Sequence, residues 1–512
     1  MTDLGPGAVI VDGGPLSVEE VVAVAIGASR AQLGLGWEEK MAPARRLVEE
    51  AVAAQAVIYG ITTGFGALAS TRVEGAEAAD LQQNLLRSHA AGVGDPLPAE
   101  LVRAMLLLRA RTLAQGHSGV RPEVVRKIVE LLSHDLLPVV PGQGSVGASG
   151  DLAPFAHLAL PLIGEGFLNR QGHIEPAGQA LAAVGLEPLH LEAKEGLSLL
   201  NGTEGMLAMA ALGVHRAERL ARAADAACAL SVEALLGSAR PFRPEIHQLR
   251  PHPGQLVSAA RIAGLIAGSE IGRSHADDFT HAVQDAYSLR CAPQVHGAVI
   301  DTLGHAREVI SRELGSVVDN PLVFPETGEV ISGGNFHGQP LAFVLDFMAI
   351  AATELGSISE RRTDRILDPQ RSAGLPAFLA ARPGVNSGYM LAQYTAAALV
   401  AENRVLAHPA SVGSIPTSGL QEDHVSMGWG AGRKLTQVLD NTARVLAVEM
   451  LCAVQGIEYR APVRPGPAIA ELCARIRRAV PPLTTDRPLG AEIEVVAELI
   501  EAGEIDLLLS SD

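Results

Sequence analysis

The stretch MLAMAALGVHRAERLARAADAACALSVEALL, Met206–Leu236, decides the fold class of this chain. It contains no proline, and apolar side chains occupy nearly every face of the helix that it would form. A helix that is apolar on most faces belongs inside a large helical bundle. Comparable patterns predict helices at Glu100–Leu113, Pro122–Ser133, Gln255–Ile271, Gln339–Ile358, Tyr389–Ala407 and Arg433–Ile457.

Residues 1–200 differ from the rest in having more glycine turns and shorter helical stretches. Ser17 and Glu20 form the pattern of a capping box, which predicts the start of the first helix. Strand signals are few, and two short hairpins are predicted at Phe167–Pro176 and Pro321–Ser332. The proline-rich segment Pro241–Pro253 predicts a surface loop.

We therefore expect a mainly α protein with a long central helical bundle, a small mixed α/β N-terminal part and short hairpins. The change in composition near residue 200 predicts an N-terminal region, 1–200, and a long-helix region, 201–512.

Composition excludes several classes of protein. The 512 residues include 57 acidic and 40 basic ones, giving a net charge of −17, and 48% are hydrophobic. Such a chain can bury a large core and is a poor polyanion binder, so we expect neither nucleic acid nor an anionic membrane as partner. The four cysteines are far apart, no basic signal region precedes Arg30, and Asp346 interrupts the most apolar stretch, Leu341–Ala352. These features predict a cytoplasmic protein without disulfides.

The densest anomaly is the glycine-rich loop, residues 141–151, PGQGSVGASGD. One interpretation is a turn before a helix, with Asp151 as N-cap. A phosphate-binding loop is excluded, because no Lys-Ser/Thr pair follows the last glycine. A third interpretation is chemical: the Gly150 nitrogen attacks the Ala148 carbonyl, and loss of two waters, one from the Ser149 side chain, leaves a 4-methylidene-imidazole-5-one.

This loop resembles the signature of the aromatic amino acid ammonia-lyases, and further blocks match that family in order along nearly the whole chain. The blocks are Tyr59-Gly60 with Thr63–Gly66, Ser88-His89, Leu199–Thr203, Gln284–Cys291, Gly334–His337 and Gln421–His424. Thr62 and Glu204 depart from the commonest family residues. Glu204 would add negative charge near the electrophile.

The resemblance implies a function and a set of roles. Ammonia is eliminated through an autocatalytic electrophile made from Ala148, Ser149 and Gly150, with no added cofactor and no metal. The roles that it implies are Tyr59 as base, Arg290 on the carboxylate, Asn201, Gln284 and Tyr287 around the amine and electrophile, and Phe336, His89 and Glu422 in substrate binding. It also implies a homotetramer whose sites draw on more than one chain.

His89 and Glu422 favour L-histidine as substrate, with trans-urocanate as product, because both can hydrogen-bond a ring nitrogen that phenylalanine lacks. This reaction would be the first step of histidine degradation. The alternative is a tyrosine or phenylalanine lyase, or an aminomutase, using the same group.

Ordinary structural roles remain open for the same residues. Tyr59 and Tyr287 could be packing residues, Arg290 an ion-pair partner, Asn201 a helix cap, and Phe336 and His89 core residues. A fumarase-type lyase would need a Gly-Ser-Ser-x-Met-Pro loop, which this sequence does not contain. An inactive helical scaffold is a further alternative, and it predicts that the glycine-rich loop stays unmodified. The spacing of His275, Asp277, Asp278 and His281 does not suit a tetrahedral metal site, and Lys194 lacks the phosphate loop of a pyridoxal enzyme.

Overall fold

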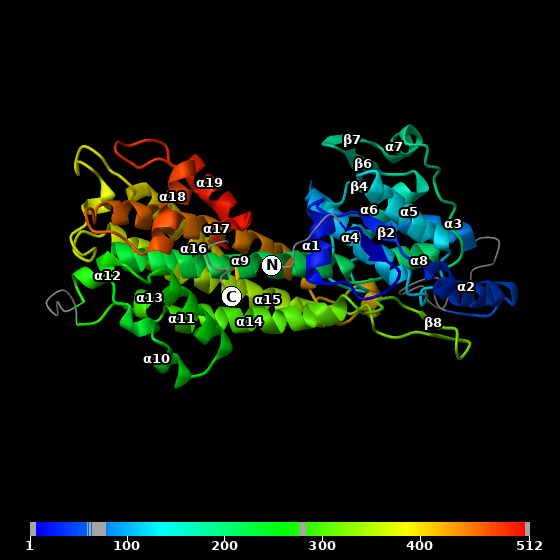
Figure 1. Cartoon of the computed structure of the whole chain (residues 1–512). Coiled ribbons are helices and arrows are strands. Elements are labelled where there is room, and N and C mark those ends of the chain that lie inside the picture. Colours follow the sequence, from blue (N-terminus) through cyan, green and yellow to red (C-terminus); the bar gives the residue numbers. More distant parts are fainter. Residues whose placement is uncertain (1–6, 59, 61–62, 64–77, 277–282, 507–512) are drawn as a thin grey trace.

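The computed structural model describes residues 7–58, 60, 63, 78–276 and 283–506. Long helices dominate it and run side by side along one axis (Figure 1). They are α9 (Glu204–Ala234), α14 (Ala292–Glu313), α15 (Gln339–Leu367), α16 (Met390–Leu406) and α17 (Gly428–Glu458). This arrangement confirms the prediction of a mainly α protein built around a long bundle.

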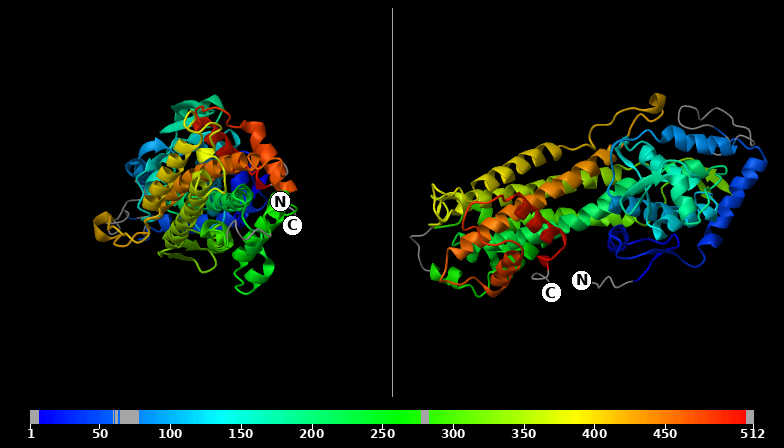
Figure 2. Two further views of the ribbon diagram at one scale, coloured as in Figure 1. Left: turned by 90° about the vertical axis from the view of Figure 1, so that its left-hand side faces the viewer. Right: turned by 90° about the horizontal axis from the view of Figure 1, so that it is seen from above.

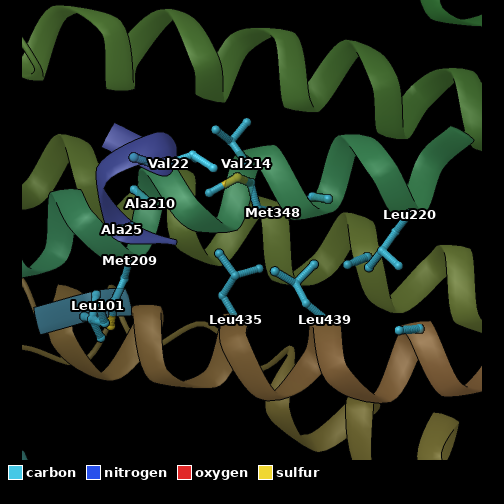
Figure 3. Packing of buried hydrophobic residues seen from close by; sticks show 14 of the residues in the cluster. Val22, Ala25, Leu101, Met209, Ala210, Val214, Leu220, Met348, Leu435 and Leu439 are labelled. Atoms are coloured by element: carbon cyan, nitrogen blue, oxygen red, sulfur yellow. The ribbon is translucent and has the colours of Figure 1, made fainter. Parts of the chain in front are cut away.

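The bundle is held together by apolar side chains from all sides of its inner helices. Figure 3 shows Met209 and Val214 of α9, Met348 of α15 and Leu435 of α17 meeting in one layer. α9 and α17 are buried along most of their length, as the apolar sequence of α9 requires. The same buried cluster includes residues from Val9 to Ile505, so segments near both termini contribute to one core.

The smaller elements before α9 gather at one end of the bundle, as Figures 1 and 2 show. The helices are α1 (Val18–Ala25), α2 (Trp37–Ala53), α3 (Ala78–His89), α4 (Ala99–Leu113), α5 (Pro122–Ser133), α6 (Leu152–Ala159), α7 (Ala177–Ala183) and α8 (Glu195–Leu200). The strands are β1 (Val9–Val11), β2 (Ala31–Leu33), β3 (Val93–Pro96), β4 (Leu136–Pro138), β5 (Pro141–Gln143), β6 (Phe167–Arg170) and β7 (His173–Pro176). β1 and β2 pair in parallel, whereas β3–β5 and β4–β6–β7 are antiparallel.

The remaining elements surround the bundle. They are α10 (Pro244–Gln248), α11 (Pro253–Leu265), α12 (Glu270–Ser274), α13 (Tyr287–Arg290), β8 (Leu322–Phe324), β9 (Glu329–Ile331), α18 (Pro467–Ala479) and α19 (Gly490–Glu501). α12 and α13 lie at the end of the bundle opposite to α6 and α8 (Figure 1).

Local predictions are largely confirmed. Ser17 accepts from the Glu20 nitrogen while the Glu20 carboxylate accepts from the Ser17 nitrogen, which is a complete capping box. Both predicted hairpins form, as β6–β7 and β8–β9.

Two predictions were wrong. The helix expected at Gln255–Ile271 breaks, because Gly268 has a φ of 76° and Ser269 caps a new helix, α12. The segment expected to be a loop, Pro241–Pro253, contains a 3₁₀ turn and α10, since proline is tolerated in the first turn of a helix.

α15 is long and apolar enough to cross a membrane by length and composition alone. Most of its apolar window is buried in the bundle, as expected for the core helix of a globular protein.

Candidate functional site

The glycine-rich loop makes a tight turn that few residue types tolerate. Gly147, Ser149 and Gly150 have φ values of 74°, 52° and 82°, in the left-handed region. At Gly150 a Cβ atom would lie 1.9 Å from the Gly202 oxygen, so no side chain fits there. The turn therefore requires glycine at 150 and holds Ser149 in a conformation that non-glycine residues rarely adopt.

Three helices begin beside this turn. α6 starts at Leu152, directly after the loop, and α9 starts just after Gly202, whose oxygen accepts from the Asp151 nitrogen at 2.8 Å. α17 follows Met427, whose nitrogen donates to the Val146 oxygen at 3.0 Å. Positive ends of helix dipoles near one turn favour negative charge that develops there.

Asp151 occupies the N-cap position of α6 but caps another helix. Its side chain makes no capping bond to α6; instead Oδ2 accepts from the Met206 nitrogen in the first turn of α9, at 2.8 Å. Burial raises the pKa of Asp151 to about 8, and the nearby negative charge of Glu204 acts in the same direction. The interpretation of Asp151 as the N-cap of the helix that follows it was therefore wrong about which helix its side chain caps.

Glu204 lies in a fully buried ion pair beneath the turn. Its Oε2 accepts from Arg109 Nη2 at 2.6 Å, and both side chains are 1% exposed. Arg109 also donates to the backbone oxygens of Ser198 and Asn201 and lies over the Phe155 ring at 4.7 Å. Burial raises the pKa of Glu204, while Arg109 opposes that shift. The extra negative charge expected at this position is therefore paired.

Glu422 reaches the turn from a distant part of the sequence. The Ser149 hydroxyl donates to Glu422 Oε1 at 3.3 Å, and Thr417 Oγ1 donates to Glu422 Oε2 at 2.8 Å. A backbone bridge between residues 417 and 422 fixes this carboxylate further. Glu422 is only half-buried, so a ligand at Ser149 can also meet it.

His89, the last residue of α3, is half-buried and close enough to be influenced by the charge of Glu422. Burial lowers the pKa of His89, while its bond to Leu85 and the Glu422 carboxylate oppose the shift. Nδ1 lies 2.9 Å from the Leu85 oxygen; since a carbonyl only accepts, Nδ1 carries the proton. Neutral His89 then presents Nε2 as an acceptor for a ring N–H.

Asn201 ends α8 and directly precedes Gly202, which bridges to Gly150. Its side chain is buried, and Nδ2 donates to the Asn320 oxygen at 2.9 Å. Asn201 Oδ1 has no hydrogen-bond partner among the described residues. Asn201 thus keeps an unpaired acceptor one residue before the glycine that bridges to the turn.

The block Gly334–His337 lies beside the block that contains Glu422. The rings of His337 and His424 stack with centroids 5.9 Å apart, and His337 Nε2 is 3.3 Å from the His424 oxygen. Phe336, adjacent to His337, is half-buried. The two blocks are therefore neighbours in space.

The block that was expected to supply Gln284, Tyr287 and Arg290 lies elsewhere. It leads into α13, at the end of the bundle opposite to α6 and α8 (Figure 1). Arg290 stacks over the Tyr287 ring at 4.5 Å and donates to the Asp285 oxygen, while Tyr287 is 71% exposed. Within one chain these residues do not meet Ser149.

Some expected residues fall outside the described part of the chain. Tyr59 is one of them, as are Asp277, Asp278 and His281 of the weak metal motif. No cluster of three potential metal ligands occurs among the described residues.

The turn fits a cyclised Ala148-Ser149-Gly150 group. Gly150 has neither a side chain nor room for one, Asn201 Oδ1 is a buried acceptor without a described partner, and Glu422 contacts the Ser149 hydroxyl. Sequence reasoning missed Arg109 and Asp319, and it considered Lys194 only for another chemistry. A single sequence could not indicate them, because an isolated Arg, Lys or Asp is normally a surface residue.

Comparison with known proteins agrees with this geometry. A family model described as aromatic amino acid lyase matches residues 16–478. A histidine ammonia-lyase of Gloeobacter violaceus is 53% identical over 496 residues, covering 97% of this chain and 96% of that protein.

Two solved structures have similar folds. The histidine ammonia-lyase of Trypanosoma cruzi superposes with a TM-score of 0.91 at 41% identity, covering 98% of this chain and 95% of its own. A tyrosine aminomutase from Streptomyces globisporus gives 0.91 at 42% identity and covers 98% of both chains.

Proposed function

The chain belongs to the aromatic amino acid lyase family, and from that premise we propose that it is a histidine ammonia-lyase. It converts L-histidine to trans-urocanate and ammonium. The observation that carries the choice of substrate is the position of Glu422, 3.3 Å from Ser149 and within electrostatic reach of His89. Both groups are acceptors, so a neutral imidazole satisfies one of them through its single N–H and a protonated imidazolium satisfies both, whereas a phenyl ring offers no N–H to either.

Each residue has a stated task in this proposal. When formed, the 4-methylidene-imidazole-5-one supplies an electrophile that turns the substrate's amino group into a better leaving group. Tyr59 takes the β-proton, and Arg290 grips the carboxylate through its planar fork. The amine is oriented by Asn201, Gln284 and Tyr287, and Phe336 packs against the substrate. The N-termini of α6, α9 and α17 favour negative charge near Ser149.

The site requires more than one chain in this proposal. Arg290 and Ser149 lie at opposite ends of the bundle, and Tyr287 is exposed where a second copy could meet it. Phe343, Phe347 and Ile350 form an exposed apolar stripe on α15, with exposed fractions of 44%, 41% and 46%. A stripe of this kind marks a contact surface. A homotetramer that buries it would bring the two halves of each site together.

The location that we propose for the protein in the cell rests on two features of the chain. Most of the apolar window of α15 is buried in the bundle, and the chain is strongly acidic. We expect a soluble cytoplasmic enzyme that binds neither nucleic acid nor membrane.

The test is release of the unsaturated acid, followed by its ultraviolet absorbance, from purified protein with each amino acid: urocanate from histidine, p-coumarate from tyrosine and cinnamate from phenylalanine. Histidine should be preferred by about 10⁴-fold in kcat/KM, and Glu422→Gln should lose most histidine turnover. The peptide containing Ala148–Gly150 should be two waters lighter than its sequence mass, and Ser149→Ala should restore the full mass. Comparable turnover of tyrosine, or formation of a β-amino acid, would assign a different member of the family.

A further inference from the structure

Lys194 has an unusual environment for a lysine. It is fully buried at the start of α8, and its φ of 71° is left-handed. Nζ donates to Asp319 Oδ2 and to Ser198 Oγ, each at 2.9 Å. Ser198 Oγ in turn donates to Asp319 Oδ2 at 3.1 Å. Lysine is almost never fully buried unless it is paired, so this ion pair is a specific feature of the site.

The second oxygen of Asp319 faces Asn201. Oδ1 accepts from the Asn320 nitrogen at 2.7 Å and from Asn201 Nδ2 at 3.4 Å. The Asn320 oxygen accepts from the same Nδ2 at 2.9 Å. If the Asn201 amide were reversed, its oxygen would face a carboxylate and a carbonyl. Asp319 and the Asn320 oxygen together determine which end of the amide remains free, and Asp319 also holds the Asn320 backbone through the 2.7 Å bond.

We propose that the Lys194–Asp319 ion pair is a positioning device that holds the Asn201 amide with its carbonyl oxygen free beside the Ala148–Gly150 turn. This inference rests on the proposed function. Lys194 balances a carboxylate that would otherwise be a buried unpaired charge, and Asp319 fixes the amide. Lys194 and Asp319 act through Asn201 and touch no reacting atom.

Two further observations support this role. Burial lowers the pKa of Lys194 and Asp319 opposes that shift, which is the behaviour of a charge held by its partner. Asn320 is itself fixed, since its Oδ1 accepts from Ser332 Oγ at 3.0 Å and from the Gly333 nitrogen at 2.8 Å. The acceptor that holds Asn201 is therefore anchored to the segment that leads into Phe336.

The test is a double variant, Lys194→Met with Asp319→Leu, made in the wild type and in Asn201→Ala. The pair of changes leaves no unpaired buried charge and should permit folding. In the wild-type background we expect a peptide that is still two waters lighter, kcat lower by about tenfold or more, and KM changed by less than about threefold. In Asn201→Ala the same two changes should lower kcat by less than about twofold, because the group they position is already absent.

Ser198→Ala is the milder variant, because it removes a hydroxyl that contacts both members of the pair. It should lower kcat several-fold in the wild type but not in Asn201→Ala, and it carries the test if the double variant does not fold. A control is Arg222→Met with Asp506→Leu, which removes a less buried 2.8 Å ion pair between α9 and the C-terminal part of the chain. This control should leave kcat unchanged.

Two outcomes would overturn the inference alone: wild-type kcat in the Lys194/Asp319 variant, or equal fold-losses in both backgrounds. An unmodified and inactive wild-type protein would instead overturn the proposed function and this inference with it.

Discussion

Gly150→Ala tests the claim that close backbone packing shapes the turn. The new Cβ would lie 1.9 Å from the Gly202 oxygen and 2.4 Å from its carbonyl carbon, distances that real Cβ atoms do not show. Residue 150 must then move by about 1 Å, which breaks the 2.8 Å bond from the Asp151 nitrogen to the Gly202 oxygen. A buried donor left unpaired costs about 1–3 kcal/mol, and the left-handed φ of 82° adds about 1–2 kcal/mol. We expect a loss of about 2–5 kcal/mol in the free energy of unfolding.

Gly172→Ala is the matched control for this experiment. Gly172 has nearly the same φ, 87°, but nothing lies within 4 Å of its Cβ position. It should therefore lose only the conformational cost of about 1–2 kcal/mol. The assay is urea unfolding followed by far-ultraviolet circular dichroism at fixed protein concentration, with mass analysis of the loop peptide. Equal losses in both variants, together with a Gly150→Ala peptide that is still two waters lighter, would refute the packing argument.

Three further predictions concern charged residues. Glu204→Gln and Arg109→Met should each destabilise the protein by about 3–5 kcal/mol in urea unfolding, because each leaves the other member of the pair as an unpaired buried charge; a loss below about 1 kcal/mol in either variant would contradict the assignment. Burial raises the pKa of Asp151 to about 8. The folded protein therefore holds a proton that the unfolded chain releases above about pH 4, and stability falls by about 1.4 kcal/mol per pH unit as pH rises toward 8. Asp151→Asn should flatten this slope in unfolding measured between about pH 5 and pH 8, and an unchanged slope would assign it to another group. Mixed oligomers of Ser149→Ala and Arg290→Met chains should regain turnover that neither variant shows alone, since a site with both residues intact can form between copies; no recovery would place both residues in one chain's site.

The long helices could be predicted from sequence because burial leaves a local pattern. A helix such as α9 is apolar on most faces, and that is visible without knowing its neighbours. The predicted ends of helices were less accurate, as the break near Gly268 shows. The sequence does not reveal whether a given glycine will adopt a positive φ. The partner of Asp151 was missed for a related reason: its carboxylate bonds to the start of α9, more than fifty positions away.

The site was predictable only where a chemical motif marks it. Ala148-Ser149-Gly150 has a composition that suggests cyclisation, and Glu422 stands within a recognisable block. Arg109 and the Lys194–Asp319 pair carry no such mark, because their roles exist only after α4, α8 and the segment around 319 have packed together. Residues that support a site through other side chains are found from geometry and not from spacing.

The arrangement also suggests why the long bundle is needed for the chemistry. In one chain, the turn with Glu422 and His89 lies at one end of the bundle, and Arg290 lies with the exposed Tyr287 at the other. A buried ion pair in the bundle contacts the segment that carries Tyr287 and Arg290. Arg362 is held by Glu449 and donates to the Ser288 oxygen at 3.3 Å. In the proposed oligomer, a rigid bundle would hold the two half-sites at a fixed separation for a second copy to complete. Arg362 and Glu449 are both fully buried, and their ion pair ties the Ser288 backbone to the core of the bundle.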